Sequence, residues 1–144
     1  MNGKLFAGLS VLLFVAACAT PHKVTKQLNN LNGDWVLAVF MPEQKKTLAE
    51  VFGSRVAELQ FNKSTNGVTG TTGCNRFASS FTADTTNLQF SENRVLTKMS
   101  CGDFDEQTFL NALDRVNRYR LNEGQLELMQ DSAILMVFAR KPHR

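Results

Sequence analysis

Three cysteines are the residues of this chain with the most distinctive chemistry, because a thiol can be acylated, oxidised or bound to a metal. Cys18 ends a largely apolar run of 13 residues, Leu5–Ala17, which follows the positive charge of Lys4. A membrane-spanning helix needs about 20 apolar residues, so the run is too short to span a bilayer. It predicts instead the hydrophobic part of a secretory signal peptide over residues 1–17.

The sequence Val15-Ala16-Ala17-Cys18 resembles a bacterial lipobox, with an aliphatic residue and two small residues before the cysteine. By that resemblance Cys18 would carry a thioether-linked diacylglycerol, become the mature N-terminus and be acylated again on its amine. Several acyl chains anchor a protein firmly, since each buried methylene contributes about 0.8 kcal/mol. The alternative is an ordinary cleaved signal peptide in which Cys18 is incidental.

The segment after the cysteine predicts a tether and a location. Residues 18–30 are mostly polar and aperiodic, as is typical of a flexible link between a membrane and a folded domain. Ala19 stands where Asp marks inner-membrane retention in many Gram-negative lipoproteins. In a Gram-negative host the expected location is therefore the periplasmic side of the outer membrane within the cell envelope.

Cys74 and Cys101 form the second thiol feature. With Cys18 used for lipid, they remain as a pair, and outside the cytosol such a pair persists as a disulfide. The bond would close a loop with a sequence separation of 27, for which the chain-entropy model gives about 3.5 kcal/mol. The alternative is two unpaired thiols buried as small hydrophobic groups.

The remaining polar residues form no catalytic pattern. The two histidines, His22 and His143, lie near the chain ends, so a buried nucleophile has no base and a structural zinc ion has too few ligands. The carboxylates of Asp103, Asp105 and Glu106 could bind a cation, but the first turn of a helix also favours carboxylates. The sequence predicts a protein with no catalytic residues, no cofactor and no metal, and hence not an enzyme.

Basic residues gather in two places. Arg115, Arg118 and Arg120 follow one another near the end of the predicted helix, and residues 141–144 form a basic C-terminal tail. They could meet lipid phosphates, or they could be ordinary cations at a helix C-terminus and a solvated chain end. The formal net charge of +3 is far below what nucleic-acid binding requires, so no nucleic-acid partner is expected.

The elements that must position these residues are mostly short strands. Asp34–Phe40 is apolar on both faces and predicts a strand buried on both sides. Further strands are expected at Val56–Asn62, Val68–Thr71, Arg76–Thr82, Asn87–Phe90, Val95–Met99, Arg120–Asn122, Gln125–Gln130 and Ala133–Arg140, with tight turns at Asn66-Gly67 and Gly73-Cys74-Asn75.

One helix interrupts the strands. Helical spacing of Phe109, Leu113 and Val116 predicts an amphipathic helix over Phe104–Asn117, opened by a capping box of Asp103 with Glu106. The fold class is therefore α+β: a mostly antiparallel, curved and possibly barrel-like sheet packed on one amphipathic helix.

Two motifs carry a family resemblance. They are Gly70-x-x-Gly73-Cys74-Asn75-Arg76-Phe77 and Thr97-x-Met99-Ser100-Cys101, followed by Glu106-x-x-Phe109-Leu110. In this order they resemble the META domain of the heat-shock protein HslJ family, over a domain spanning residues 31–140. Of these motif residues, Asn75 could pin the turn or bind a ligand, Arg76 could pair with a carboxylate, and Phe77 is expected in the core.

The resemblance implies a membrane-anchored envelope lipoprotein associated with heat-shock expression and novobiocin tolerance. We therefore expect a non-enzymatic protein that acts through surface contacts in stress response or drug tolerance. One alternative is a lipocalin-like binder of small apolar ligands or acyl chains, which would need an interior cavity of about 300 Å³ or more. Another is a periplasmic chaperone, inhibitor or assembly pilot for an envelope protein, which would need an exposed apolar patch.

Overall fold

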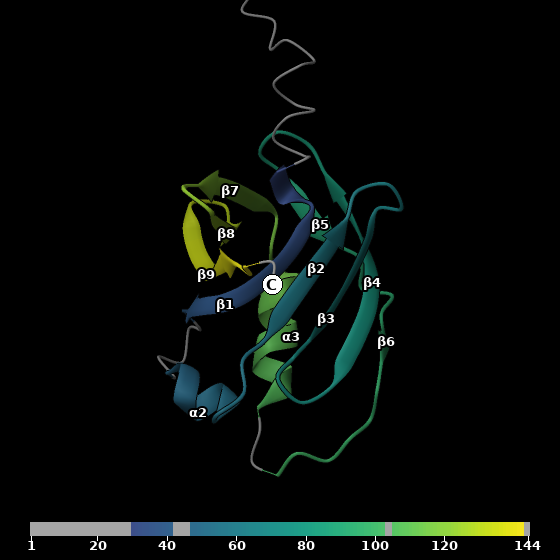
Figure 1. The fold of residues 1–144 in the computed structure, drawn as a ribbon, viewed down its shortest axis with the longest axis vertical. Helices are drawn as coiled ribbons and strands as arrows, with labels where there is room; N and C mark the ends of the chain where they lie inside the picture. Colours follow the sequence, from purple (N-terminus) through teal and green to yellow (C-terminus); the bar gives the residue numbers. More distant parts are fainter. Residues whose placement is uncertain (1–29, 42–46, 103–104, 143–144) are drawn as a thin grey trace, which may run out of the picture.

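Antiparallel strands and two helices make up the part of the chain that the computed structural model describes, residues 30–41, 47–102 and 105–142 (Figure 1). The elements in chain order are β1 (Gly33–Phe40), α2 (Leu48–Phe52), β2 (Glu58–Asn62), β3 (Gly67–Thr71), β4 (Arg76–Ala83), β5 (Leu88–Phe90), β6 (Val95–Leu96), α3 (Glu106–Asp114), β7 (Arg118–Asn122), β8 (Gln125–Gln130) and β9 (Ala133–Arg140). Within these ranges no helix is long and apolar enough to cross a membrane.

The sheet curls into a nearly closed barrel. Its order is β5-β4-β3-β2-β1-β9-β8-β7, with β6 also paired to β4, and each described pairing is antiparallel. The two ends of this order meet where Asn87 bridges Arg118 and where the backbone N–H of Tyr119 donates to the carbonyl of Thr86 at 2.9 Å. The α+β class and the barrel-like, antiparallel sheet predicted from the sequence are confirmed, but two helices, α2 and α3, pack on the sheet in the described ranges instead of the one predicted.

The first strand is buried on one side, not on both as its composition predicts. Trp35 and Leu37 face the core with 1% and 3% of their surface exposed, whereas Ala38 and Val39 face solvent. The pairing of β1 with β9 shifts by one residue between Leu37 and Val39, which is a β-bulge. Because the extra residue reverses the alternation of side chains, Phe40 returns to the core.

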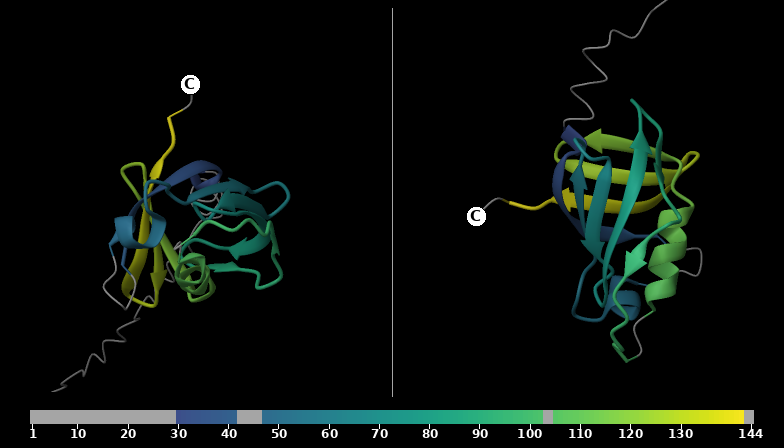
Figure 2. Two further views of the ribbon diagram at one scale, coloured as in Figure 1. Left: turned by 90° about the horizontal axis from the view of Figure 1, so that it is seen from below. Right: turned by 90° about the vertical axis from the view of Figure 1, so that its right-hand side faces the viewer.

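Helix α3 lies between the two halves of the curled sheet, where Figure 2 shows it nearly end-on in the view from below. Its buried face carries Phe109, which contacts Phe40 of β1 and Phe52 of α2 at ring-centroid distances of 6.3 and 5.7 Å. These aromatic contacts join both helices to the central strand, and edge-on ring pairs add to the energy of burial.

The helix is shorter than the sequence predicts. It ends at Asp114 because the next residues turn into β7, where the backbone N–H of Asn117 already pairs with the carbonyl of Met129 at 3.0 Å. Its N-cap is Asp105, whose side chain accepts a hydrogen bond from the backbone N–H of Thr108 at 3.2 Å. The predicted cap at Asp103 and the predicted start at Phe104 lie outside the described residues.

The interior of the barrel is filled by large side chains. The largest side chains with no more than 2% of their surface exposed are Trp35, Phe52, Phe61, Phe109, Phe138, Leu31, Leu59, Leu88, Leu113, Leu126, Leu128 and Met136. They come from strands on both sides of β1 and from both helices. The Trp35 indole N–H is satisfied by the carbonyl of Leu31 at 2.9 Å, as a buried donor requires.

Tyr119 closes the seam between the two sheet ends with its side chain. Only 3% of it is exposed, and its hydroxyl donates to the backbone carbonyl of Asp84 at 2.8 Å. Burial raises the pKa of Tyr119 to about 12, and the negative charge of Asp84 adds to the rise. The phenol is therefore neutral over the whole range in which the protein is expected to work.

The alkaline titration of Tyr119 tests this seam, because the chain has one tyrosine. A pKa above the free value of 10 means that the folded state favours the protonated phenol, so this stabilisation is complete below pH 10 and is lost as the pH rises through about 12. We expect the ultraviolet absorbance of tyrosinate to appear near pH 12 in native protein and near pH 10 in urea. A native transition near pH 10 would contradict a buried phenol, and Tyr119→Phe provides the blank.

Candidate functional site

A sharp corner between β3 and β4 forms the centre of the candidate site. Gly73 has a φ of 96°, a conformation that glycine adopts readily. The hydroxyl of Thr72 accepts hydrogen bonds from the backbone N–H groups of Cys74 and Asn75 at 3.2 and 2.9 Å. Thr72 and Asn75 are the two fully buried polar residues in the described ranges, with 0% and 3% exposure. The corner is therefore a closed, internally satisfied turn.

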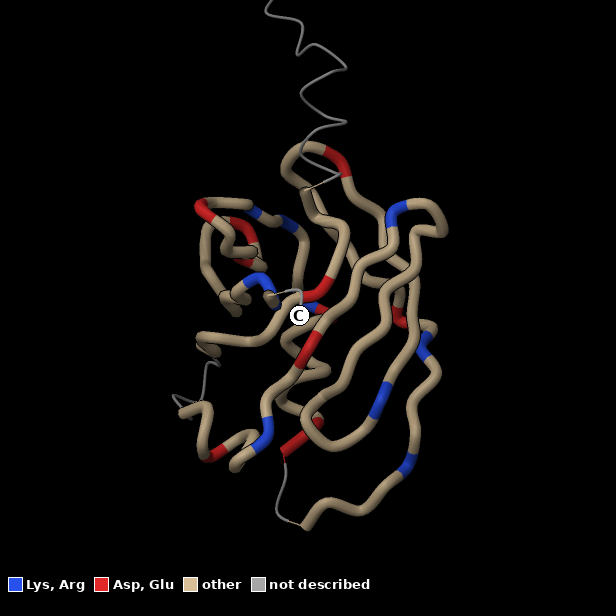
Figure 3. The backbone as a smooth tube through the Cα atoms, viewed as in Figure 1, with Lys and Arg blue, Asp and Glu red and all other residues tan. Residues whose placement is uncertain are grey.

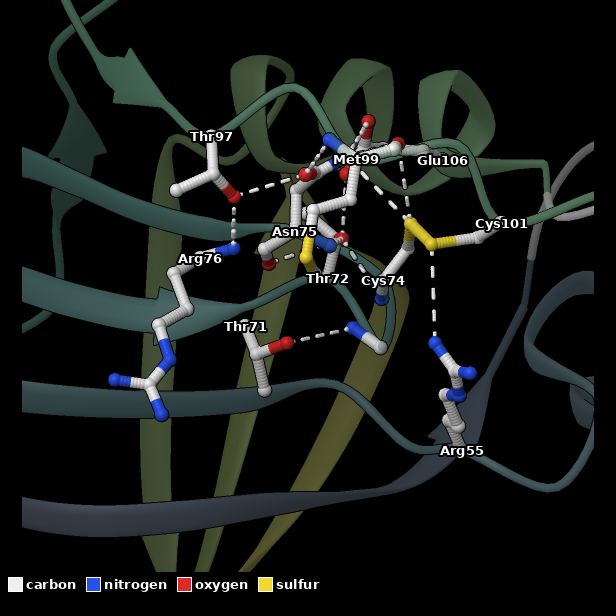
Figure 4. Close-up of a disulfide and its surroundings, with 11 residues drawn as sticks. Arg55, Thr71, Thr72, Cys74, Asn75, Arg76, Thr97, Met99, Cys101 and Glu106 are labelled. Atoms are coloured by element: carbon white, nitrogen blue, oxygen red, sulfur yellow. Dashed lines mark hydrogen bonds between the residues drawn. A yellow bond between two sulfur atoms is a disulfide. The ribbon is translucent and has the colours of Figure 1, made fainter.

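The side-chain amide of Asn75 links this corner to the segment 97–99. Its Oδ1 accepts from the Thr97 hydroxyl at 2.8 Å and from the backbone N–H of Met99 at 2.7 Å, while its Nδ2 donates to the Met99 carbonyl at 3.3 Å. Figure 4 shows these groups converging on the amide. The strand predicted over Val95–Met99 is correct only for Val95–Leu96, because beyond Leu96 this side chain takes over much of the hydrogen bonding.

Glu106 joins the helix to the same corner. Its carboxylate accepts from the Thr72 hydroxyl at 2.5 Å and from Asn75 Nδ2 at 3.1 Å. The sequence predicts Glu106 in the first turn of a helix, as a charge that stabilises the helix terminus. It does not predict the contacts of Glu106 with Thr72 and Asn75. Asp105 performs the expected capping instead. The sequence does not indicate the role of Thr72 either, because a threonine before a glycine corner has no distinctive pattern.

A disulfide closes the corner from the outside. Cys74 and Cys101 are bonded, with their Cα atoms 6.0 Å apart, within the range that the bond requires. Cys74 is 7% exposed and Cys101 is half-buried, and Nη1 of Arg55 lies 3.7 Å from the Cys101 sulfur. The bond and the amide network therefore hold the same segment at two points, residues 97–99 and Cys101.

Other predicted site residues are placed apart from this corner. Arg118 begins β7, and Arg120 pairs with Glu127, with Nε 2.6 Å from the carboxylate. From the tail, Lys141 holds Glu58 at 2.8 Å. Arg140, just before it, lies over the Trp35 ring at 4.3 Å from the ring centre. Arg120, Arg140 and Lys141 are thus engaged within the domain. Cys18, His22 and His143 lie outside the described residues.

An open groove lies beside the corner, on the outer face of β2, β3, β4 and β6. Its volume is about 570 Å³. We call it the outer groove, and its lining is Asp34, Glu58, Leu59, Gln60, Thr69, Gly70, Thr71, Arg76, Phe77, Ala78, Val95 and Thr97. Thr97 is held by the backbone N–H of Arg76 at 3.0 Å as well as by Asn75, so the family motifs build one wall of the groove.

The charges of the outer groove are unequal. Asp34 accepts a hydrogen bond from Gln60 at 2.7 Å, and Glu58 is paired with Lys141, so both carboxylates have partners. The guanidinium of Arg76 has no hydrogen-bond or ion-pair partner in the described part of the chain. Between them β3 carries no charge, as Figure 3 shows. Arg76 is therefore the charged side chain of the lining that has no bonded partner among the described residues.

A second hollow, also of about 570 Å³, lies at the seam and is polar. The backbone N–H groups of Asn87 and then Thr86 hold the pKa of Asp84 below its ordinary value. Asn117 and Asp131 bond each other at 2.9 and 2.7 Å. Among the described residues no cluster of three or more His, Cys, Asp or Glu side chains could hold a metal ion. These polar groups mainly hold the seam together.

Removing the disulfide measures its contribution to stability. Replacing both cysteines, Cys74→Ala with Cys101→Ala, should lower the free energy of unfolding by about 3.5 kcal/mol, because the unfolded chain regains the entropy of the open loop. Urea unfolding of the oxidised wild type and the variant gives the difference. Alkylation of unreduced, denatured wild-type protein should label neither thiol, and labelling of both would show that the bond is absent.

Exchanging donor and acceptor tests the contact between Asn75 and Glu106. Asn75→Asp places two carboxylates together and should cost about 2 to 4 kcal/mol at neutral pH, because a donor is lost and like charges meet. Adding Glu106→Gln should recover part of that loss, since the new amide can donate to the new carboxylate. If the losses of the two single variants simply add in urea unfolding, the two side chains are not coupled.

Comparison with known proteins places the chain. A model of the META domain matches residues 26–143, and no curated protein matches at a significant level. The fold is similar to the NMR structure of a protein from Burkholderia xenovorans, with 21% identity, 96% of this chain and 100% of that chain covered, and a TM-score of 0.63. It is also similar to the crystal structure of a DUF4847 family protein from Bacteroides vulgatus, with 14% identity, 78% and 95% covered, and a TM-score of 0.56. At these identities the two structures support the fold, while the match over most of the chain shows that this protein belongs to the META domain family.

Proposed function

We propose that this protein is a lipid-anchored component of the bacterial cell envelope that acts by surface contacts, without catalysis, in envelope stress or novobiocin-type drug tolerance. Three observations support the proposal. The leader ends in a lipobox-like sequence at Cys18, the domain belongs to the META family, and the barrel interior is filled by side chains.

The packing of the interior distinguishes binding inside the barrel from binding at its outer surface. Large side chains such as Trp35, Phe61 and Phe138, each no more than 2% exposed, occupy the space between the sheet and the helices. A lipocalin-like protein keeps this space free for its ligand. The packing therefore favours function at the outer surface over the binding of acyl chains inside the barrel.

The outer surface offers apolar contacts. Val95 and Met99, with 77% and 56% exposure, flank Thr97 at the wall of the outer groove. Val39 and Met41 are exposed at the end of β1. Exposed large apolar side chains of this kind favour contact with a partner, such as another envelope protein. This supports the hypothesis that the protein makes its surface contacts as a chaperone, inhibitor or assembly pilot.

The polar groups support a role without catalysis. The carboxylates that line the outer groove are occupied by Gln60 and Lys141, and the buried carboxylate–amide cluster around Asn75 is fully used to hold the corner. A catalytic site instead presents an acid or base toward a bound substrate. Arg76 is the charged side chain of the groove without a bonded partner in the described ranges, and one guanidinium cannot act as both general acid and general base.

Acylation of Cys18 is the point on which the proposed location depends. In a bacterial host with lipoprotein processing, the wild-type chain should incorporate radiolabelled palmitate and sediment with membranes, because several acyl chains anchor it. Cys18→Ser should abolish the palmitate label. Cys101→Ala is the matched control and should keep the label, since its thiol is assigned to the disulfide. Equal labelling of wild type and Cys18→Ser would refute the anchor.

A further inference from the structure

The outer groove has the size of a small-molecule site and a rigid floor. Its volume of about 570 Å³ falls within the range of typical ligand pockets. Gly70 is in register with Leu59 and Phe77, whose side chains point into the core, so this part of the floor is backbone with no side chain on the groove side. The far wall is fixed by the bonds of Thr97 to Asn75 and Arg76. A preformed site of this kind loses little entropy on binding.

Register places a row that is apolar at its β4 and β6 end beside a charged row on this face. The first row across the strands is Gln60, Thr69, Ala78 and Val95, and the neighbouring row is Glu58, Thr71 and Arg76. Ala78 and Val95 are exposed, and 77% of the surface of Val95, at the wall of the groove, is accessible to solvent. The groove crosses three strand spacings from β6 to β2, or about 14 Å. An apolar chain of moderate length could therefore lie along it.

The free charge next to this apolar row is the guanidinium of Arg76. Asp34 and Glu58 are engaged by Gln60 and Lys141, and neither carboxylate bonds to the Arg76 guanidinium. A planar guanidinium suits a carboxylate, which it can bind through two parallel hydrogen bonds. The backbone groups of this face are paired within the sheet, so an added peptide strand could not bond to them. Recognition must come from side chains, which favours a small ligand.

We propose that the outer groove binds a small amphiphilic carboxylate, with its carboxylate on Arg76 and its alkyl chain over Gly70, Ala78 and Val95. This proposal does not depend on lipidation of Cys18. It differs from the lipocalin-like alternative, because the ligand lies on the outer face of the sheet and the filled interior takes no part.

Decanoate below its micellar concentration is the probe. The protein is the full chain with Cys18→Ser, which carries no acyl chain that would compete for the groove. We expect decanoate to shift the backbone amide resonances of Gly70, Ala78 and Val95 in a saturable way. Arg76→Gln should weaken binding about tenfold or more, since the charge-assisted contact is lost. Arg120→Gln, which removes a guanidinium on β7, should leave the affinity unchanged.

Two further measurements separate the contribution of the ligand's carboxylate from that of its alkyl chain. Decanol, which has the chain without the carboxylate, should bind about tenfold or more weakly than decanoate. Ala78→Leu should block decanoate while Arg76 is intact, because the larger side chain fills the groove. No saturable shift, equal affinity for decanol, or equal effects of Arg76→Gln and Arg120→Gln would each overturn the proposal. Each variant is compared only if its amide spectrum shows the native fold, and Arg76→Lys, which keeps one charge, replaces Arg76→Gln if that variant does not fold.

Discussion

The buried amide of Asn75 is the constraint on which the arrangement of this domain depends. A side-chain amide removed from water must have its donors and acceptor satisfied, at a cost of about 1 to 3 kcal/mol for each group left without a partner. Here the partners come from Thr97, Met99 and Glu106. Because these lie on segments far apart in the sequence, satisfying one amide holds the β3–β4 corner, the wall of the outer groove and the start of α3 together. The disulfide covalently ties two of these parts, the corner at Cys74 and the segment that continues from the groove wall to Cys101.

In this arrangement the interior stabilises the fold, and the outer face of the sheet is available for binding a ligand. Helix α3, positioned at its start by Glu106, turns Phe109 toward Phe40 and Phe52 and fills the space that the curled sheet encloses. Among the described residues, no helix lines the outer groove on β2, β3 and β4. Short and uncharged side chains on β3 leave a hollow there, and Arg76 stands beside it without a partner in the described ranges. Binding at this face would not disturb the core.

The closure of the barrel depends on a smaller contact between the two ends of the sheet. The β5 and β7 sides meet through an isolated bridge at Asn87 and Arg118 and through Tyr119, whose phenol is buried against the Asp84 carbonyl. At this seam side chains, and not a full ladder of backbone hydrogen bonds, connect the two ends of the sheet. The polar hollow lies where the ladder is missing. A curved sheet with few free edges is protected from pairing with other chains.

Local patterns in the sequence determined the strands, the tight turns and the single long helix, because alternation, glycine and helical spacing act over a few residues. The spacing of Cys74 and Cys101 and the motifs around them also indicated the family. Tertiary structure alone decided the rest. The bulge after Leu37 arises from pairing with β9, helix α3 ends where β7 begins, and Glu106 turns from a helix-capping charge into a partner of Thr72 and Asn75. Whether Arg76 has a partner depends on what the register of neighbouring strands brings near it, and no local pattern contains that information.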